Sequence, residues 1–246
     1  MSLWIKICAN TTLADAQLAA EAGADAVGFV FAPSPRRVSP VQVAAITPHL
    51  PPTLEKIGVF VDASFDEIAS TVEAAGLTGV QLHFNASREL SAQIRARFGP
   101  GLRILRVVHF NAENAARLTG LVSGHDFSRA ESGRHHKVRA LTPEGAFSDP
   151  HTDAILVDSR TVSAVGGTGM TFDWGLAANT FFQNAKARER RMVAAGGLAP
   201  ENIAEAIATL RPWGVDVVSG VESAPGRKDP AKVRAFIANA RAAGHS

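Results

Sequence analysis

The sequence predicts an α/β fold in which eight parallel strands close into a single (β/α)8 TIM barrel. Three observations carry this prediction. Short runs of valine, isoleucine and leucine alternate with alanine-rich amphipathic stretches along the chain. The runs are apolar throughout, which is typical of strands that helices cover on both faces. The length of 246 residues matches the roughly 250 that such a barrel typically needs.

Each of eight strand candidates is followed by a helix candidate. The first strand spans residues 3–7, and its helix is predicted to be capped by Thr11 or Thr12 and closed by Gly23. The other strand candidates are AVGFVF, EKIGVFVD, GVQLHF, LRILRVVHF, AILVDS, RMVAAGG and GVDVVSG. Eight such units favour a closed barrel, although periodicity alone leaves an open doubly wound sheet as the alternative. No Gly-x-Gly-x-x-Gly follows the first strand, which argues against a dinucleotide-binding sheet.

A polar stretch around residues 122–152 interrupts the repeat. It contains glycine and serine without clear periodicity, so we expect one domain over 1–246 with an insertion at this place. Histidines in the stretch suggest a metal site as an alternative; they are His125, His135, His136 and His151. They lack the spacing that places two ligands on one helix face, and we expect no metal.

The bulk properties exclude several classes of function. The net charge of +2 comes without a long basic stripe, so nucleic-acid binding is not expected. No apolar run reaches the roughly 18 residues of a membrane span, and the first residues do not resemble a signal peptide. The single cysteine excludes an internal disulfide. We expect a cytoplasmic protein with neither a nucleic-acid nor a membrane partner. The sequence leaves the oligomeric state open and slightly favours a monomer.

Two candidate catalytic residues stand where strands are predicted to end. In a barrel of this type, reacting groups lie at the carboxyl ends of the strands. Asp158 follows four apolar residues, and a partly desolvated carboxyl there suits a general acid, with loop capping as the alternative. Cys8 follows the first strand; a lone cysteine is more often a small buried hydrophobe. Lys6, however, shares its face of the strand, and a buried ammonium paired with Asp216 of the last strand would favour the thiolate.

Binding residues are predicted in three further loops. Gly196 and Gly197 follow the seventh strand, and Ser219 and Gly220 follow the eighth, where backbone N–H groups of such barrels cradle phosphate. The alternative is that these glycines only make tight turns. Arg36, after the second strand, offers a donor fork for a carboxylate or phosphate, with plain surface charge as the alternative.

Over nearly its whole length the sequence resembles the phosphoribosylanthranilate isomerase family. The motifs that carry the resemblance are KIC at residues 6–8, SPRRVS at 34–39, VQLH at 80–83, LVDS with GGTGMTFDW within 156–174, AGGLAPENI at 195–203 and VDVVSGVESAPGRKD at 215–229. The sequence departs from the family at Ala9 and Phe84, where glycine is usual, and in the length of the polar stretch.

The resemblance implies an Amadori rearrangement of N-(5-phosphoribosyl)anthranilate in tryptophan biosynthesis, without a cofactor. Asp158 would be the general acid and Cys8 the general base. Arg36 would bind the anthranilate carboxylate, and the backbones of the four phosphate-loop residues would bind the phosphorylated end of this small-molecule substrate. Two alternatives keep the phosphate loops: another sugar-phosphate isomerase or lyase that does not need Cys8, and a barrel that binds such ligands without turnover.

Overall fold

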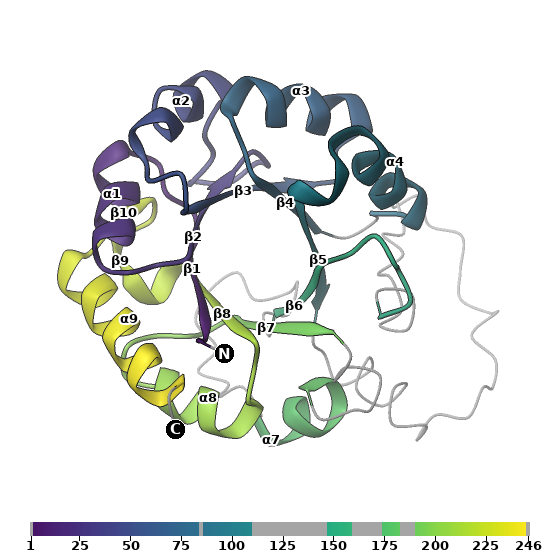
Figure 1. Ribbon diagram of the computed structural model, residues 1–246. Helices are drawn as coiled ribbons and strands as arrows, with labels where there is room; N and C mark the ends of the chain where they lie inside the picture. The colour runs from purple at the N-terminus through teal and green to yellow at the C-terminus, as the bar shows by residue number, and fades with distance from the viewer. Residues whose placement is uncertain (1, 84–85, 110–146, 159–173, 183–189, 245–246) are drawn as a thin grey trace, which may run out of the picture.

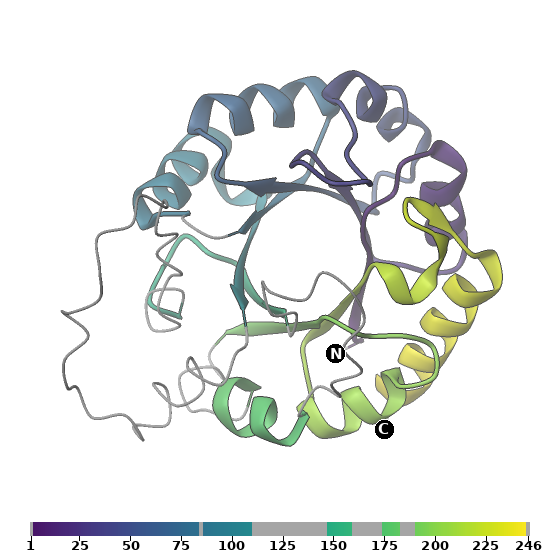
Figure 2. The same ribbon diagram turned by 180° about the vertical axis from the view of Figure 1, so that it is seen from behind.

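Eight parallel strands form a closed barrel in chain order, from β1 round to β8 and back to β1. The structure is a computed structural model that describes residues 2–83, 86–109, 147–158, 174–182 and 190–244. Helices surround the ring of strands, as Figure 1 shows along the barrel axis and Figure 2 from behind. The predicted fold class is therefore confirmed, and closure excludes the open sheet.

The barrel strands are short and sit in parallel register with their neighbours. Their bounds are β1 Trp4–Ile7, β2 Ala26–Val30, β3 Glu55–Val61, β4 Gly79–His83, β5 Arg103–His109, β6 Ala154–Asp158, β7 Arg191–Ala195 and β8 Gly214–Val217. The helices among the described residues are α1 Leu13–Glu21, α2 Pro40–Ala44, α3 Phe65–Ala75, α4 Arg88–Phe98, α7 Trp174–Ala177, α8 Ile203–Leu210 and α9 Pro230–Gly244. Short 3-10 turns lie at Thr47–His49, Gly99–Gly101 and Ser219–Val221 (η4), and a π-helical turn, Ala178–Phe182, continues α7.

Local sequence signals explain where several helices begin and end. Thr12, one of the two predicted caps, accepts a hydrogen bond from the Asp15 backbone N–H at 3.1 Å and starts α1. Ser64 and Glu67 form a capping box at the start of α3. The helix after β2 is shorter than its apolar pattern suggests: Pro48 has no backbone N–H to donate to the Ala44 carbonyl, and α2 ends at Ala44 before a 3-10 turn.

Alternate residues of each strand face two different layers of the core. Ile5 and Ile7 of β1 pack outward into the cluster between the strands and the helices. Trp4 belongs to the cluster inside the barrel, and Lys6 between them is fully buried. This alternation is the one expected for β1, and it directs Lys6 toward the barrel axis below Cys8.

A small antiparallel ribbon of β9 (Glu222–Ala224) and β10 (Arg227–Lys228) follows β8, and the sequence did not predict it. It lies beside α1 and α9 in Figure 1. The Thr11 hydroxyl donates to the Gly226 carbonyl at 2.6 Å, and the Lys228 backbone N–H donates to Asp15 at 3.3 Å. The ribbon is therefore fastened to the loop after β1 and to α1.

The helix candidate that follows the fifth strand, near residues 113–121, lies outside the described residues. So does most of the predicted insertion. Its last six residues, 147–152, are described and lie against the barrel. There Asp149 is fully buried and accepts a hydrogen bond from Arg106 at 2.9 Å. Across the part of the chain that the structure describes, no helix has both the length and the apolar character needed to span a membrane.

Candidate active site

A cavity of about 170 Å³ opens at the carboxyl ends of the strands and brings together almost all predicted site residues. Its lining includes both predicted catalytic residues, the predicted arginine and three of the four predicted phosphate-loop residues: Cys8, Asp158, Arg36, Gly196, Gly197 and Ser219. Ala9, Gln81, His83 and Asp216 also line it. The thiol and the carboxyl thus share one rim of the barrel and one cavity.

Cys8 stands one residue beyond β1 and is only 3% exposed. Its backbone N–H donates to the Val217 carbonyl of β8 at 2.9 Å. Beneath it, the Lys6 ammonium donates to Asp216 Oδ1 and to Gln81 Oε1, both at 2.9 Å. The predicted pairing of Lys6 with Asp216 is confirmed, because closure of the barrel places β8 next to β1.

Burial and the Lys6 charge have opposite effects on the pKa of the Cys8 thiol. Burial raises the pKa of the Cys8 thiol, while the nearby Lys6 charge lowers it, and burial prevails. Lys6 therefore favours the thiolate as expected, but its effect is smaller than that of burial. Although burial lowers the pKa of Lys6, the charges of Asp216 and Cys8 raise it more, so the ammonium stays protonated. The site holds a buried thiol beside a fixed positive charge.

Two neighbours of Cys8 control its position. Gly28 of β2 leaves room for the thiol, since a Cβ atom there would stand 2.5 Å from Cys8 Sγ. Ala9 adopts a left-handed conformation with φ of 61°, which is suited to the glycine usual in the family. The chain therefore keeps the turn after Cys8 at the cost of local backbone strain. Phe84, the other departure, lies outside the described residues.

Asp158 is the last residue of β6 and is partly exposed to the cavity. In the parallel register it lies opposite His109 of β5 and Ala195 of β7. His83, at the end of β4, also lines the cavity, and its Nε2 lies 2.9 Å from Gln81 Nε2. Gln81 thus links His83, by this contact, to the buried Lys6 ammonium.

The two glycine-bearing loops are packed against each other. Gly196 and Gly197 have φ values of 87° and 65°, which glycine adopts without strain. Gly220 does not line the cavity; a Cβ atom on it would overlap the Leu198 carbonyl oxygen. Asn202 fastens the first loop by donating to the Gly197 carbonyl at 2.9 Å and accepting from the Ala199 N–H at 2.8 Å. Close backbone approach therefore requires glycine at 220, whereas the positive φ values favour glycine at 196 and 197.

Arg36 is not a free surface charge. Its Nε donates to both oxygens of Glu222, at 2.9 and 3.1 Å, and its Nη2 donates to one of them at 2.6 Å. A guanidinium has five N–H donors, and within the described part of the chain these bonds use only Nε and Nη2, so the Nη1 group remains available there. Glu222 was not among the predicted site residues, although it lies within the VDVVSGVESAPGRKD motif at residues 215–229.

Gln81 and Gly28 were missed in the same way, because their roles depend on which strands are neighbours. The histidines of the alternative metal interpretation are described only at His151; the other three lie outside the described residues. Among the residues that are described, no cluster of three or more histidine, cysteine or acidic side chains is arranged to hold a metal ion.

Fold and site together define a (β/α)8-barrel enzyme with a cavity at the carboxyl ends of its strands, where such barrels place their active sites. The family model described as N-(5'phosphoribosyl)anthranilate (PRA) isomerase matches residues 5–124 and 134–239. The chain belongs to the N-(5'-phosphoribosyl)anthranilate isomerase family. The break between the two matched ranges falls within the polar stretch around 122–152.

Curated relatives and solved structures agree with the family model. The N-(5'-phosphoribosyl)anthranilate isomerase of Pelobacter propionicus is 41% identical over 234 residues, which are 95% of this chain and 93% of that protein. The crystal structure of the Thermotoga maritima enzyme is similar with a TM-score of 0.77 and 34% identity, covering 98% of this chain and 99% of that one. A crystal structure of a phosphoribosyl anthranilate isomerase in complex with reduced 1-(o-carboxyphenylamino)-1-deoxyribulose 5-phosphate has a TM-score of 0.73 and 32% identity, covering 98% of this chain and 99% of that one.

The predicted reaction is confirmed by this membership. The enzyme converts N-(5-phosphoribosyl)anthranilate to 1-(2-carboxyphenylamino)-1-deoxyribulose 5-phosphate in tryptophan biosynthesis. The alternatives of a different sugar-phosphate enzyme and of a binding protein without turnover are thereby set aside. The roles of the individual residues are a separate matter.

Proposed function

We propose that Cys8 and Asp158 carry out the isomerisation as general base and general acid. The observation that supports this is the single cavity in which a buried thiol, a carboxyl and two glycine loops meet. An acid and a base suffice for this reaction, because the substrate's own nitrogen supplies its lone pair as the sugar ring opens and takes electrons back when C2 loses its proton.

In the first step, Asp158 donates a proton to the ring oxygen of the ribose. The bond between C1 and the ring oxygen breaks, and the lone pair of the anthranilate nitrogen forms a C=N double bond to C1. The partly exposed position of Asp158 at the end of β6 leaves its carboxyl within the cavity, where it can take up and release a proton.

In the second step, the Cys8 thiolate removes the proton on C2. The electrons of the C2–H bond form a C1=C2 double bond, and those of the C=N bond return to nitrogen, which gives an enolamine. The enolamine then takes up a proton at C1 while its C2 hydroxyl loses one, and the product is a ketose. The Lys6 charge supports this step because it offsets part of the rise that burial causes in the pKa of Cys8.

The remaining predicted residues bind the two ends of the substrate. Arg36 offers its Nη1 donors to the anthranilate carboxylate while Glu222 holds the other edge of the guanidinium. The backbones of Gly196 and Gly197 and of Ser219 and Gly220 bind the phosphate, as loops after the seventh and eighth strands do in many such barrels. A solved relative bound to a reduced carboxyphenylamino-deoxyribulose phosphate supports a ligand with these two ends. We expect the reaction to take place in the cytoplasm.

Replacing each reacting group tests the assignment. The fluorescence of N-(5-phosphoribosyl)anthranilate is followed as it decays with purified wild-type enzyme, Cys8→Ala and Asp158→Asn. Removing a general acid or base should lower kcat by roughly 10²–10⁴-fold. Circular dichroism and melting temperatures close to wild type would show that folding is intact. A Cys8→Ala enzyme with nearly full kcat would contradict the role given to the thiol.

A further inference from the structure

The ribbon of β9 and β10 brings two buried charges behind the active-site cavity. The side chain of Glu222 is 4% exposed and that of Lys228 is fully buried. Neither residue is among those that line the cavity in the described part of the chain. Burying a carboxylate and an ammonium is costly unless each finds good partners, so what these two groups contact indicates what they are for.

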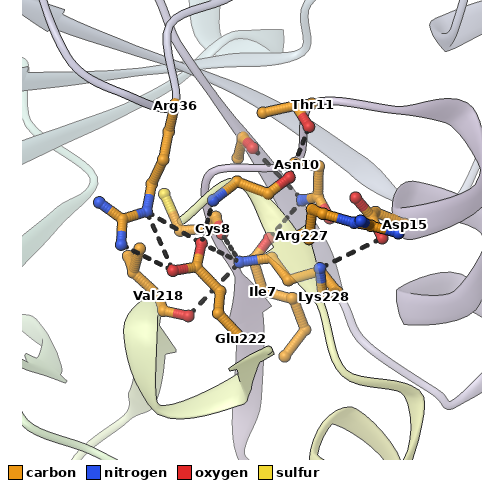
Figure 3. A network of polar contacts seen from close by, with 12 residues as sticks. Ile7, Cys8, Asn10, Thr11, Asp15, Arg36, Val218, Glu222, Arg227 and Lys228 are labelled. Carbon is orange, nitrogen blue, oxygen red and sulfur yellow. Dashed lines mark hydrogen bonds and ion pairs between the residues drawn. The ribbon is translucent and has the colours of Figure 1, made fainter. Parts of the chain in front are cut away.

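The Glu222 carboxylate is directed mainly at Arg36. It accepts three hydrogen bonds from the guanidinium, the shortest 2.6 Å, whereas the Lys228 ammonium lies 3.4 Å away. The Gly226 backbone N–H, at the turn of the ribbon, donates to the same carboxylate at 3.3 Å. Figure 3 shows Glu222 between the two cations, with the Cys8 side chain close to Arg36. One edge of the guanidinium is thus fixed, and its Nη1 group is the part left for a ligand.

The Lys228 ammonium holds the backbone just beyond two neighbouring strands, β1 and β8. It donates to the Cys8 carbonyl at 2.6 Å and to the Val218 carbonyl at 3.4 Å. These carbonyls belong to the residue proposed as base and to the residue just before the Ser219–Gly220 phosphate loop. The ribbon therefore contacts three elements of the site, through Arg36, Cys8 and Val218, without touching the cavity itself.

We propose that Glu222, held by Lys228, is a positioning residue that presents Arg36 to the carboxylate of the substrate. This inference rests on the proposed binding role of Arg36. Glu222 touches neither substrate nor reacting atoms; it acts through the guanidinium. Lys228 balances its charge and ties the same ribbon to the backbone at Cys8 and Val218. Because the carboxylate is not a reacting group, loss of this arrangement should weaken substrate binding more than it slows the chemistry.

Two substrates and two Glu222 variants test the proposal. One substrate is N-(5-phosphoribosyl)anthranilate, and the other is the phosphoribosyl adduct of aniline, which lacks the carboxylate. Glu222→Gln keeps the shape of the side chain but loses its charge. Glu222→Asp keeps the charge beside Lys228 but is too short to make the same contacts with Arg36. Either variant should raise KM for the anthranilate substrate about tenfold, with kcat within about threefold of wild type.

The adduct of aniline distinguishes positioning from a general structural role. With this substrate, both Glu222 variants should have kcat/KM within about twofold of wild type, since no carboxylate is there for Arg36 to bind. Equal losses on both substrates would overturn the proposal, and so would an unchanged KM for the anthranilate substrate. The comparison needs only one of the two variants to fold.

Glu55→Gln is the matched control. Glu55 also receives two hydrogen bonds from an arginine, Arg103, each at 2.6 Å, but at the opposite end of the barrel. It should change the melting temperature without changing KM for either substrate. Failure of the proposed catalytic roles would appear separately, as Cys8→Ala or Asp158→Asn enzymes that keep their kcat.

Lys228→Met tests the hydrogen bonds from the ammonium to the Cys8 and Val218 carbonyls. Removing the ammonium frees the Cys8 and Val218 carbonyls, so kcat should fall about tenfold with both substrates, a loss that the Glu222 variants do not share. A Lys228→Met enzyme with the kcat of wild type would show that these backbone hydrogen bonds do not support catalysis, and that part of the proposal would be wrong.

Discussion

The two ends of this barrel are built on different principles. At the amino end, Trp213 stacks on Trp4 with ring centroids 5.2 Å apart, and the guanidinium groups of Arg103 and Arg191 lie 5.5 and 5.1 Å from its ring centre. These side chains are large, and their charges are partly open to water. At the carboxyl end, charges are buried, glycines allow close backbone approach, and Ala9 is held in a strained conformation.

The difference shows where the molecule gains stability and where it gives stability up. Stacked aromatic rings with cations over their faces stabilise a fold at little cost in desolvation. A buried ion pair such as Lys6 with Asp216 contributes little net stability, because desolvation offsets much of the attraction. The carboxyl end therefore holds buried charges that add little stability but that the proposed chemistry needs. The aromatic and cation contacts at the amino end make up for this in the stability of the fold. Three substitutions test this division, from the largest expected effect to the smallest.

Lys6→Met should have the largest effect, on both stability and catalysis. It leaves the buried Asp216 without its cation, which should lower the free energy of unfolding by about 3–5 kcal/mol. It also removes a charge that lowers the pKa of Cys8, so that pKa should rise further. Since Cys8, as the proposed base, must be deprotonated, the ascending limb of the pH profile of kcat/KM should move to higher pH.

Urea unfolding and a pH–rate profile would measure both effects. The double variant Lys6→Met with Asp216→Leu should recover much of the stability, since no unpaired charge is left, but not the position of the limb. An ascending limb at the wild-type pH in the single variant would mean that Lys6 does not act on the thiol.

Trp213→Ala should affect stability alone. The loss of the stacking and of the cation contacts should lower the free energy of unfolding by about 2–3 kcal/mol, somewhat less than for a fully buried tryptophan. At a temperature where the variant stays folded, kcat/KM should be within about twofold of wild type, because the ring lies at the end away from the cavity. Val41→Ala, at a side chain that is 79% exposed, is the control and should change stability by less than about 0.5 kcal/mol. A large loss of kcat/KM in Trp213→Ala would contradict the division between the ends.

Ala9→Gly should have the smallest effect, and in the opposite direction. A left-handed alanine costs roughly 1–2 kcal/mol, while glycine gives back about 0.5–1 kcal/mol through its freedom in the unfolded chain. The net gain of about 0.5 kcal/mol corresponds to a rise in melting temperature of about 1–2 °C. Asp62→Gly, at another left-handed residue outside the catalytic cavity, is the comparison. Its gain should be smaller, since aspartate tolerates this conformation better. A lower melting temperature for Ala9→Gly would show that the turn carries no strain.

The strand repeat and the strand ends could be predicted from the sequence, because each depends on local pattern and on the general rule for barrels. Lys6 and Asp216 could be paired in advance, since closure makes the first and last strands neighbours. The contact of Arg36 with Glu222 could not, because it depends on a ribbon of five strand residues that has no distinctive pattern. The role of Gly28 could not be predicted either, because it depends on the space that the Cys8 thiol, just beyond the neighbouring strand β1, occupies.

The ion pair beneath Cys8 also bears on how the enzyme is made. Lys6 and Asp216 are 210 residues apart, so during synthesis on the ribosome the lysine exists long before its carboxylate does. Until β8 emerges, the first strand lacks one of its two neighbours and the counter-ion for its inward-facing charge. An incomplete nascent chain therefore lacks the ion pair beneath Cys8, and we expect isomerase activity to arise only after the last strand has closed the ring.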